Sequence, residues 1–264
     1  MISKEFIVVP DLLLQQPDEI IKMIDVFWHG RARGSFPEWA VEDCRSFFPK
    51  FSDNLVIQPE IVYQHKPHFD NYKDKTLMLV GGGPSSKCDW ENNDYDFIWS
   101  MNHFYLNEKL KNKKVDLAMI MGEPDVTSNE FVEYARKYKP YLGFEVDAKW
   151  FRYQFDDYKN YFCMHSRFYG RIGVGIRMLI LAASLGFSKV LFTGLDGPEP
   201  IVKGDHAFQP GKKTLPVCFN NMSLDDMCIE FKKQYDCAWD IIKHINTKTQ
   251  FINIGAGSIY HEKC

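Results

Sequence analysis

Glycines and small polar side chains follow several short apolar runs of this chain, and they are the residues best suited to contact a ligand. The run at residues 76–80 is followed by Gly81, Gly82 and Gly83, and then by Ser85. Successive glycines let a ligand approach the backbone closely, and their amides can face a phosphate or a ribose. We expect these four residues to bind a nucleotide, and a bulky residue at Gly81 or Gly83 to block it while the fold survives. A tight structural turn is the alternative.

Two further apolar runs end in groups that suit the same site. Asn102 follows the run at residues 97–101, and Thr193 and Gly194 close a later run. An amide side chain can read a base or a hydroxyl through paired donor and acceptor bonds. Because ligands bind at the carboxyl ends of parallel strands, we expect Asn102, Thr193 and Gly194 to contact the nucleotide.

A short segment ahead of another apolar stretch has the composition of an anion site. Arg171, Gly173 and Gly175 lead into a stretch that is apolar almost all round and reads as a buried helix. Free amides at the start of a helix bind anions, and an arginine adds a charge that can pair with two oxygens. We therefore expect Gly173 and Gly175 to bind the ligand and Arg171 to take part in catalysis.

His206 and Asp196 are the candidates for acid–base chemistry. A histidine titrates closest to neutral pH, and His206 lies in a polar loop that contains Lys203, Gly204 and Asp205. His206 can serve as a base towards a hydroxyl or as a donor towards a departing phosphate. One protonation state does not allow both roles, and the sequence does not choose between them. Asp196 is the alternative base.

Several classes of site are absent from the sequence. The third glycine of a dinucleotide fingerprint would fall at Ser86, and neither a phosphate-binding loop ending in Gly-Lys-Ser/Thr nor a Gly-x-Ser-x-Gly elbow occurs. No histidines and carboxylates stand at metal-ligand spacing, and the seven cysteines contain no Cys-x-x-Cys pair. We expect no metal and no bound cofactor.

The elements that must position these residues follow an α/β pattern. Short apolar runs predict strands, and segments of helical periodicity between them predict helices, which is typical of a mostly parallel sheet. The predicted helices span residues 128–138, 176–185 and 224–245, with capping residues at Ser128 and Ser223. The predicted strands span residues 76–80, 97–101, 117–121, 190–193 and 251–254.

The first part of the chain differs from the rest in composition and in hydrophobic pattern. Residues 1–74 are rich in proline and contain one clear helical pattern, at residues 17–28. We predict a partly helical N-terminal appendage over residues 1–74 and one larger catalytic domain over residues 75–264. The net charge of −3 gives no general attraction to nucleic acid, and no apolar run reaches the roughly 18 residues of a membrane helix. We expect a cytoplasmic protein.

The order and spacing of four motifs resemble a known family of enzymes. They are Leu-Met-Leu-Val-Gly-Gly-Gly-Pro-Ser at 77–85, Met-Asn-His-Phe-Tyr at 101–105, Arg-Ile-Gly-Val-Gly at 171–175 and Val-Leu-Phe-Thr-Gly-Leu-Asp at 190–196. In this order they resemble the bacterial lipooligosaccharide sialyltransferases of glycosyltransferase family 42 and their sialyltransferase-like relatives. The resemblance covers roughly residues 75–255.

The resemblance implies a fold, a donor and roles for particular residues. It implies a Rossmann-like sheet of the A-type variant with helices on both faces, no essential metal, and a CMP-activated nine-carbon keto-sugar as donor. It places nucleotide contacts on the glycine turn, Asn102 and Thr193–Asp196. Gly82 stands where the family has an asparagine, His206 where it has a tyrosine, and no histidine falls near residues 220–223, where the family has its base.

The resulting expectation is a metal-independent glycosyltransferase that moves a sugar from a nucleotide donor to a glycan hydroxyl. A CMP-sugar is the favoured donor, and a glycan or lipooligosaccharide is the acceptor, which would bring the protein to the membrane surface. The sequence does not decide whether the protein forms a homo-oligomer. The alternatives are a nucleotide-dependent enzyme of the pyrophosphokinase type and a non-catalytic nucleotide binder.

Overall fold

The structure is a computed structural model, and it describes residues 67–120, 128–145, 158, 160–164, 174–213, 222–245 and 248–255. The helix predicted at residues 17–28, most of the predicted appendage, Arg171 and Gly173 lie outside these ranges. Within the described ranges, no helix has the length and apolar content to cross a bilayer.

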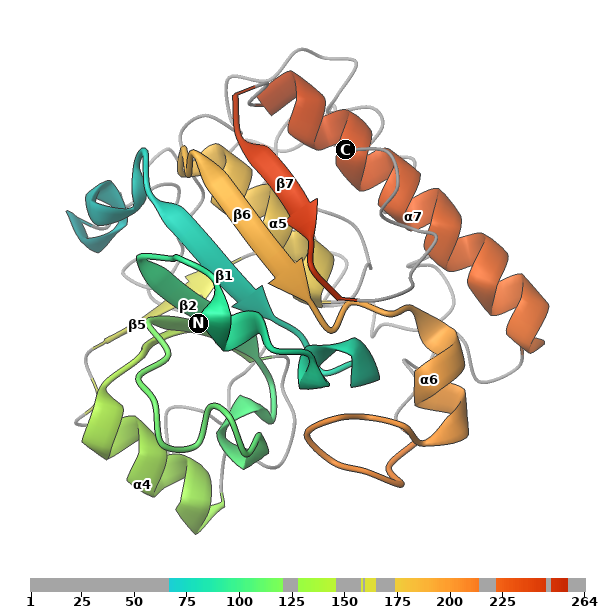
Figure 1. Cartoon of the computed structure of the whole chain (residues 1–264), viewed down its shortest axis with the longest axis horizontal. Coiled ribbons are helices and arrows are strands. Elements are labelled where there is room, and N and C mark those ends of the chain that lie inside the picture. Colours follow the sequence, from blue (N-terminus) through green and yellow to red (C-terminus); the bar gives the residue numbers. More distant parts are fainter. Residues whose placement is uncertain are drawn as a thin grey trace, which may run out of the picture.

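A seven-stranded sheet forms the centre of the fold, and all six of its strand pairs are parallel (Figure 1). The strand order is β5-β4-β3-β2-β1-β6-β7, so the chain builds outwards from β1 and then returns to its other side. The strands are β1 Thr76–Val80, β2 Phe97–Met101, β3 Leu117–Ile120, β4 Tyr141–Glu145, β5 Tyr161–Met164, β6 Lys189–Thr193 and β7 Gln250–Asn253.

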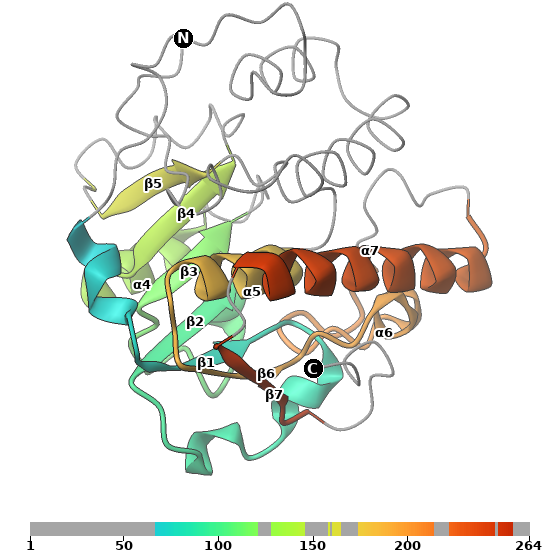
Figure 2. The same cartoon turned by 90° about the horizontal axis from the view of Figure 1, so that it is seen from above.

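Helices cover both faces of this sheet, as predicted. The long helix α7 lies beside α5 over one face (Figure 2), and α4 packs on the other. The α-helices are α4 Asn129–Tyr138, α5 Val174–Ser184, α6 Pro198–Lys203 and α7 Leu224–Ile245. Short 3-10 turns are η4 Pro67–Tyr72, η5 Pro84–Lys87, η6 Trp90–Asn92 and η7 Phe104–Leu106.

The alternation of side chains along the strands divides the interior into two cores. Leu77 and Leu79 of β1 face α5 and α7, whereas Met78 and Val80 face α4. All four are fully buried, as expected of a central parallel strand that is apolar on both faces. The unbroken apolar run in the sequence therefore has a direct structural cause, and the Rossmann-like α/β fold is confirmed.

The two predicted capping serines do accept hydrogen bonds from backbone amides at the starts of their helices. The Ser128 hydroxyl accepts a hydrogen bond from the Phe131 amide at 3.2 Å, and Ser223 accepts one from the Asp226 amide at 3.1 Å. The predicted helix at 176–185 instead begins at Val174, so Gly175 lies within its first turn. Two strands, β4 and β5, and the short helix α6 were not predicted.

The η4 turn belongs to the main core although the sequence places it in the appendage. Phe69 and Tyr72 are buried in the core that contains α5. The Tyr72 ring packs edge-on against Phe97 and Trp99, with ring centroids 4.9 and 5.2 Å away. The core of the α/β domain therefore includes residues that precede position 75.

Candidate functional site

The strand order creates a reversal point between β1 and β6, where open parallel sheets bind their ligands. In the register of the sheet, Val80 lies opposite Thr193 on one side and Ser100 on the other. The residues that follow these positions therefore emerge at one edge. This is the reason why Gly81–Gly83, Asn102 and Gly194 come together from distant parts of the sequence.

The turns after β1 and β6 are joined by backbone hydrogen bonds. The Gly81 amide donates to Thr193 O, and the Gly83 amide donates to Gly194 O, each at 2.8 Å. Gly194 has a φ of 73°, in the left-handed region that favours glycine. A Cβ at Gly81 would lie 2.4 Å from Gly194 O, so the close approach of the two turns requires glycine.

These contacts correct the expected effect of substitutions in the glycine turn. A Cβ at Gly83 would lie 2.3 Å from an Asp196 carboxylate oxygen. At both Gly81 and Gly83 a larger side chain therefore meets the protein itself. We therefore expect such changes to destabilise the fold as well, because the two glycines permit the packing of the β1 and β6 turns.

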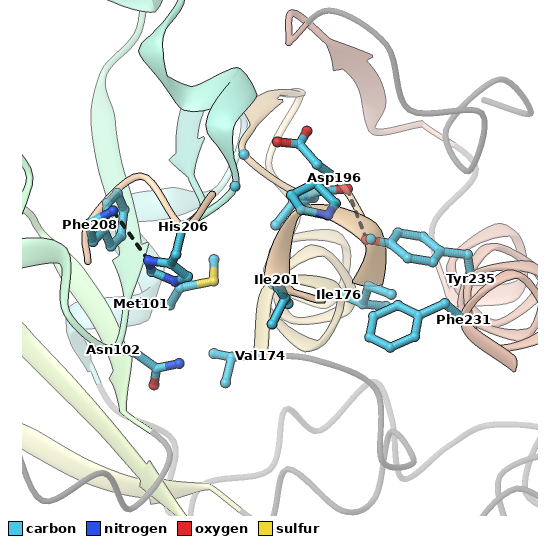
Figure 3. A pocket seen from close by; sticks show the side chains of 17 residues that line it. Met101, Asn102, Val174, Ile176, Asp196, Ile201, His206, Phe208, Phe231 and Tyr235 are labelled. Atoms are coloured by element: carbon cyan, nitrogen blue, oxygen red, sulfur yellow. Dashed lines mark hydrogen bonds between the residues drawn. The ribbon is translucent and has the colours of Figure 1, made fainter. Parts of the chain in front are cut away.

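Ser85 and Asp196 hold the same two turns together through side chains. Asp196 accepts the Ser85 amide at 2.8 Å on one oxygen and the Ser85 hydroxyl at 2.5 Å on the other. The Ser85 hydroxyl also accepts the Gly194 amide at 2.8 Å, and the Thr193 hydroxyl donates to Ser85 O at 2.9 Å. The Asp196 carboxylate is thereby turned away from His206 (Figure 3).

A cavity of about 160 Å³ opens at this edge of the sheet (Figure 3). Its polar side is formed by the glycine turns, Asn102 and His206. Its other side is an apolar wall from α5, α6 and α7. The wall, as we call it from here on, consists of Val174, Ile176, Ile201, Phe231 and Tyr235.

Asn102 lies directly after β2 and lines the cavity. Its backbone has a φ of 47°, a left-handed conformation that asparagine tolerates better than most residues, and its amide donates to Met119 O at 2.9 Å. Its side chain extends into the cavity across from Val174 (Figure 3). The turn thus directs a side-chain amide, with both donor and acceptor, towards the ligand space.

His206 is half-buried and lies directly over Gly82. A Cβ at Gly82 would be 2.4 Å from His206 Nε2, so the imidazole occupies the space where a side chain at position 82 would begin. The loop is fixed there because the Ala207 amide donates to Gly82 O at 2.7 Å. The Phe208 and Gln209 amides both donate to His206 Nδ1, each at 3.2 Å.

The surroundings of His206 favour its neutral form. Burial, which is the largest cause, and the nearby charges of His103 and Lys212 together lower the pKa of His206 to about 4. The His103 and His206 rings lie with their centroids 6.4 Å apart. His206 is therefore uncharged at neutral pH.

The structure sorts the predicted site residues into three groups. Gly82, Gly83, Asn102, Gly175, Gly194, Asp196 and His206 line the cavity. Gly81, Ser85 and Thr193 lie behind it, where they join the turns. Arg171 and Gly173 are outside the part of the chain that the structure describes.

The apolar wall is the part of the site that sequence reasoning missed. Phe231 and Tyr235 belong to the stripe of α7 that reads as core, and both are indeed buried at 8% and 3% exposure. Tyr235 also donates a hydrogen bond to Leu195 O at 3.2 Å, beside the β6 turn. Ile201 lies on α6, a short helix that was not predicted. Only their placement in space marks these residues as part of the site.

The described residues hold no group of three or more His, Cys, Asp or Glu side chains that could bind a metal ion. The polar groups of the described lining are backbone amides, the Asn102 amide, the Asp196 carboxylate bound to Ser85, the His206 imidazole and the Tyr235 hydroxyl, which donates to Leu195 O. Such a set can donate hydrogen bonds to an anionic or hydroxyl-rich ligand, and it can accept hydrogen bonds from a nucleobase.

Comparison with known proteins gives matches among solved structures. The α-2,3-sialyltransferase Cst-I from Campylobacter jejuni has 16% sequence identity and a TM-score of 0.46, over 71% of this chain and 78% of that one. The sialyltransferase CstII from Campylobacter jejuni, in complex with cytidine-5'-monophosphate, has 15% identity and a TM-score of 0.47, over 72% of this chain and 84% of that one. CstII with a trisaccharide acceptor and CMP has 16% identity and a TM-score of 0.45.

The matched structures are sialyltransferases, the class of enzyme that the four sequence motifs resemble. The values describe a distant likeness. No protein-family model and no curated protein sequence matches the chain.

Proposed function

We propose that this protein is a glycosyltransferase that takes its sugar from a nucleotide donor. The observation that carries the proposal is the cavity at the β1–β6 reversal point, where the glycine turns, Asn102 and the first turn of α5 converge. This convergence offers amide donors to a phosphate and a side-chain amide to a base or ribose. The order of the four motifs along the sequence supports the same conclusion.

The chemistry of sugar transfer suits the groups at this cavity. As the bond to the sugar breaks, positive charge develops on the sugar and negative charge on the departing phosphate. Preorganised donors aimed at that phosphate stabilise the transition state, and no metal is needed if they suffice. Backbone amides at the start of α5 and the His206 imidazole can supply such donors, together with Arg171, which keeps its predicted role.

The donor that we propose is a CMP-activated keto-sugar, and the acceptor is a hydroxyl of a glycan. Both follow from the motif resemblance. The apolar wall faces the polar strand ends across the cavity, so a ligand in this site contacts a hydrogen-bonding surface on one side and an apolar surface on the other. A sugar ring with acyl or deoxy substituents meets both requirements.

A panel of nucleotides tests this proposal. We expect CMP to raise the melting temperature, and UDP, GDP, ATP and NAD to raise it less at equal concentration. A ligand at a hundredfold excess over its Kd stabilises the fold by about 2.7 kcal/mol, which a thermal-shift assay detects easily. Stabilisation by ATP alone would favour the pyrophosphokinase type, and CMP binding without turnover of any CMP-sugar would favour a non-catalytic binder.

A matched pair of variants localises the binding. Asn102→Gly removes the side-chain amide and keeps the left-handed backbone, so we expect CMP affinity to fall about tenfold. The control is Asp74→Gly, because Asp74 has the same left-handed conformation, at φ 61°, but precedes β1 at the opposite end of the strand. Equal CMP affinity in both variants would place the nucleotide elsewhere.

A further inference from the structure

The hydrogen bonds of His206 fix which of its nitrogens carries the proton. Nδ1 accepts from two backbone amides, Phe208 N and Gln209 N. A backbone N–H can only donate, so Nδ1 must present its lone pair to both. A neutral imidazole has one proton on its ring nitrogens, and here that proton is on Nε2.

The protonated nitrogen is the one that faces the site. Nε2 is the ring atom closest to the position of a Gly82 side chain, and His206 lines the cavity. Among the described residues Nε2 has no hydrogen-bond partner. The loop therefore presents an N–H group to the ligand space, and the lone pair of the ring is already used by the loop itself.

We propose that His206 acts on the ligand as an uncharged hydrogen-bond donor through Nε2, and that the base of the reaction is a different group. The inference rests on the proposed function for the identity of the ligand, and it resolves the choice that the sequence leaves open. The acceptor is an oxygen of the nucleotide sugar. The donor is set in place by the loop before any ligand arrives.

The alternative role as a base is opposed by the same contacts. To accept a proton at Nε2, a neutral ring would first have to move its proton to Nδ1, where it would face two N–H groups. A doubly protonated ring would face the same two amides. Among the described residues, the charged or titratable groups around it are His103 from the turn after β2, Lys212 from its own loop and Asp196 across the cavity. The first two oppose a positive ring, and the third is bound to Ser85.

Nitrogen NMR tests the protonation state without any ligand or activity. In protein labelled with ¹⁵N-histidine, long-range ¹H–¹⁵N spectra distinguish protonated from unprotonated ring nitrogens, and His206→Asn identifies the signals of residue 206. We expect a protonated Nε2 and a bare Nδ1 at pH 7.5 and unchanged at pH 5.5. A proton on Nδ1, or a doubly protonated ring at pH 5.5, would overturn the proposal.

Two variants then test the donor role with CMP as the probe. The amide nitrogen of His206→Gln can reach the place of Nε2 and still donate, whereas His206→Asn keeps an acceptor for the loop amides and loses the donor. We expect His206→Asn to weaken CMP binding about tenfold and His206→Gln to retain most of the affinity. Equal affinities in the parent and both variants would refute the donor role. A parent protein that binds no CMP would refute the proposed nucleotide site, and the NMR result would still decide the protonation state.

Discussion

Single glycines at the strand ends serve different purposes. Gly81 and Gly194 allow two backbone turns to touch, since a Cβ at either would lie 2.4 Å from a carbonyl oxygen of the other. Gly82 instead makes room for the His206 imidazole. The same triplet of glycines thus contributes to stability through one member and to the ligand-facing surface through another.

The Ser85 hydroxyl gives the first test at the residue scale. Ser85→Ala removes a hydrogen bond to the Asp196 carboxylate and leaves the Gly194 amide without its acceptor. Losing these bonds should lower the free energy of unfolding by about 1–3 kcal/mol, measured by urea denaturation. Ser184→Ala is the control, because the Ser184 hydroxyl donates to Leu181 O within its own helix and does not join two turns. Equal stability of the two variants would show that Ser85 does not join the turns.

The depressed pKa of His206 makes a second prediction, on pH. Its pKa is about 4 in the fold, against an ordinary histidine value of 6.5, so between these values the unfolded chain binds more protons. The free energy of unfolding should therefore fall as the pH drops from 6.5 towards 4. The His206→Asn variant should lose less of this free energy over the same range. Urea denaturation of both proteins at pH 7.5 and 5.0 measures the difference. A parallel decline of the two would contradict the low pKa.

The start of α5 is the element that fits most closely against the β6 turn. A Cβ at Gly175 would lie 2.2 Å from a terminal methyl carbon of Leu195, which is itself buried. Gly175 was predicted to bind the ligand through its amide, and it does line the cavity. Its lack of a side chain also lets the helix approach the turn.

This contact predicts that Gly175→Ala lowers the free energy of unfolding in the parent protein but not in the Leu195→Ala variant. Gly175→Ala alone should destabilise the fold, because the new methyl meets Leu195. Leu195→Ala alone should cost roughly 2–5 kcal/mol by leaving a cavity. In the double variant the new methyl enters that space, so adding Gly175→Ala to Leu195→Ala should be neutral or stabilising. Additive losses in urea denaturation would show that the two residues do not share one contact.

The elements differ in how far the sequence could predict them. The strand at Phe97–Met101 and the helix at Leu224–Ile245 have the predicted bounds, since each carries a clear apolar pattern and α7 has a capping serine. Strand β4, Tyr141–Glu145, contains a glycine in its middle, and α6 has prolines at two of its first three positions, which favours a loop prediction.

The site was predictable only as far as the sheet determines it. Asn102 and Gly194 could be placed together because the carboxyl ends of parallel strands share an edge. Ile201 and Phe231 could not, because nothing in a single sequence says where a helix lies across the sheet. The bonds that commit Asp196 to Ser85 and His206 Nδ1 to its own loop likewise depend on tertiary placement.

At the scale of the whole molecule, the account requires sugar transfer without a metal. In the proposed reaction, amide and imidazole donors of the cavity stabilise the departing phosphate, and so we expect release of CMP from a CMP-sugar to continue in EDTA at an unchanged rate. The measurement is the rate of CMP formation before and after chelation, and again after Mg²⁺ or Mn²⁺ is restored. A rate that vanishes in EDTA and returns with the metal would contradict this expectation.

The central claim is that a nucleotide occupies the cavity between the β1 and β6 turns, and methyl NMR during a CMP titration tests it most directly. In protein labelled at Met and Ile methyl groups, Met101, Ile176 and Ile201 report on the cavity. Met78 and Ile98, buried on the opposite face of the sheet, serve as controls. We predict saturable shifts of the three cavity methyls, with the two controls unchanged. Saturating CMP that leaves the cavity methyls where they were, or that moves only the controls, would contradict the claim.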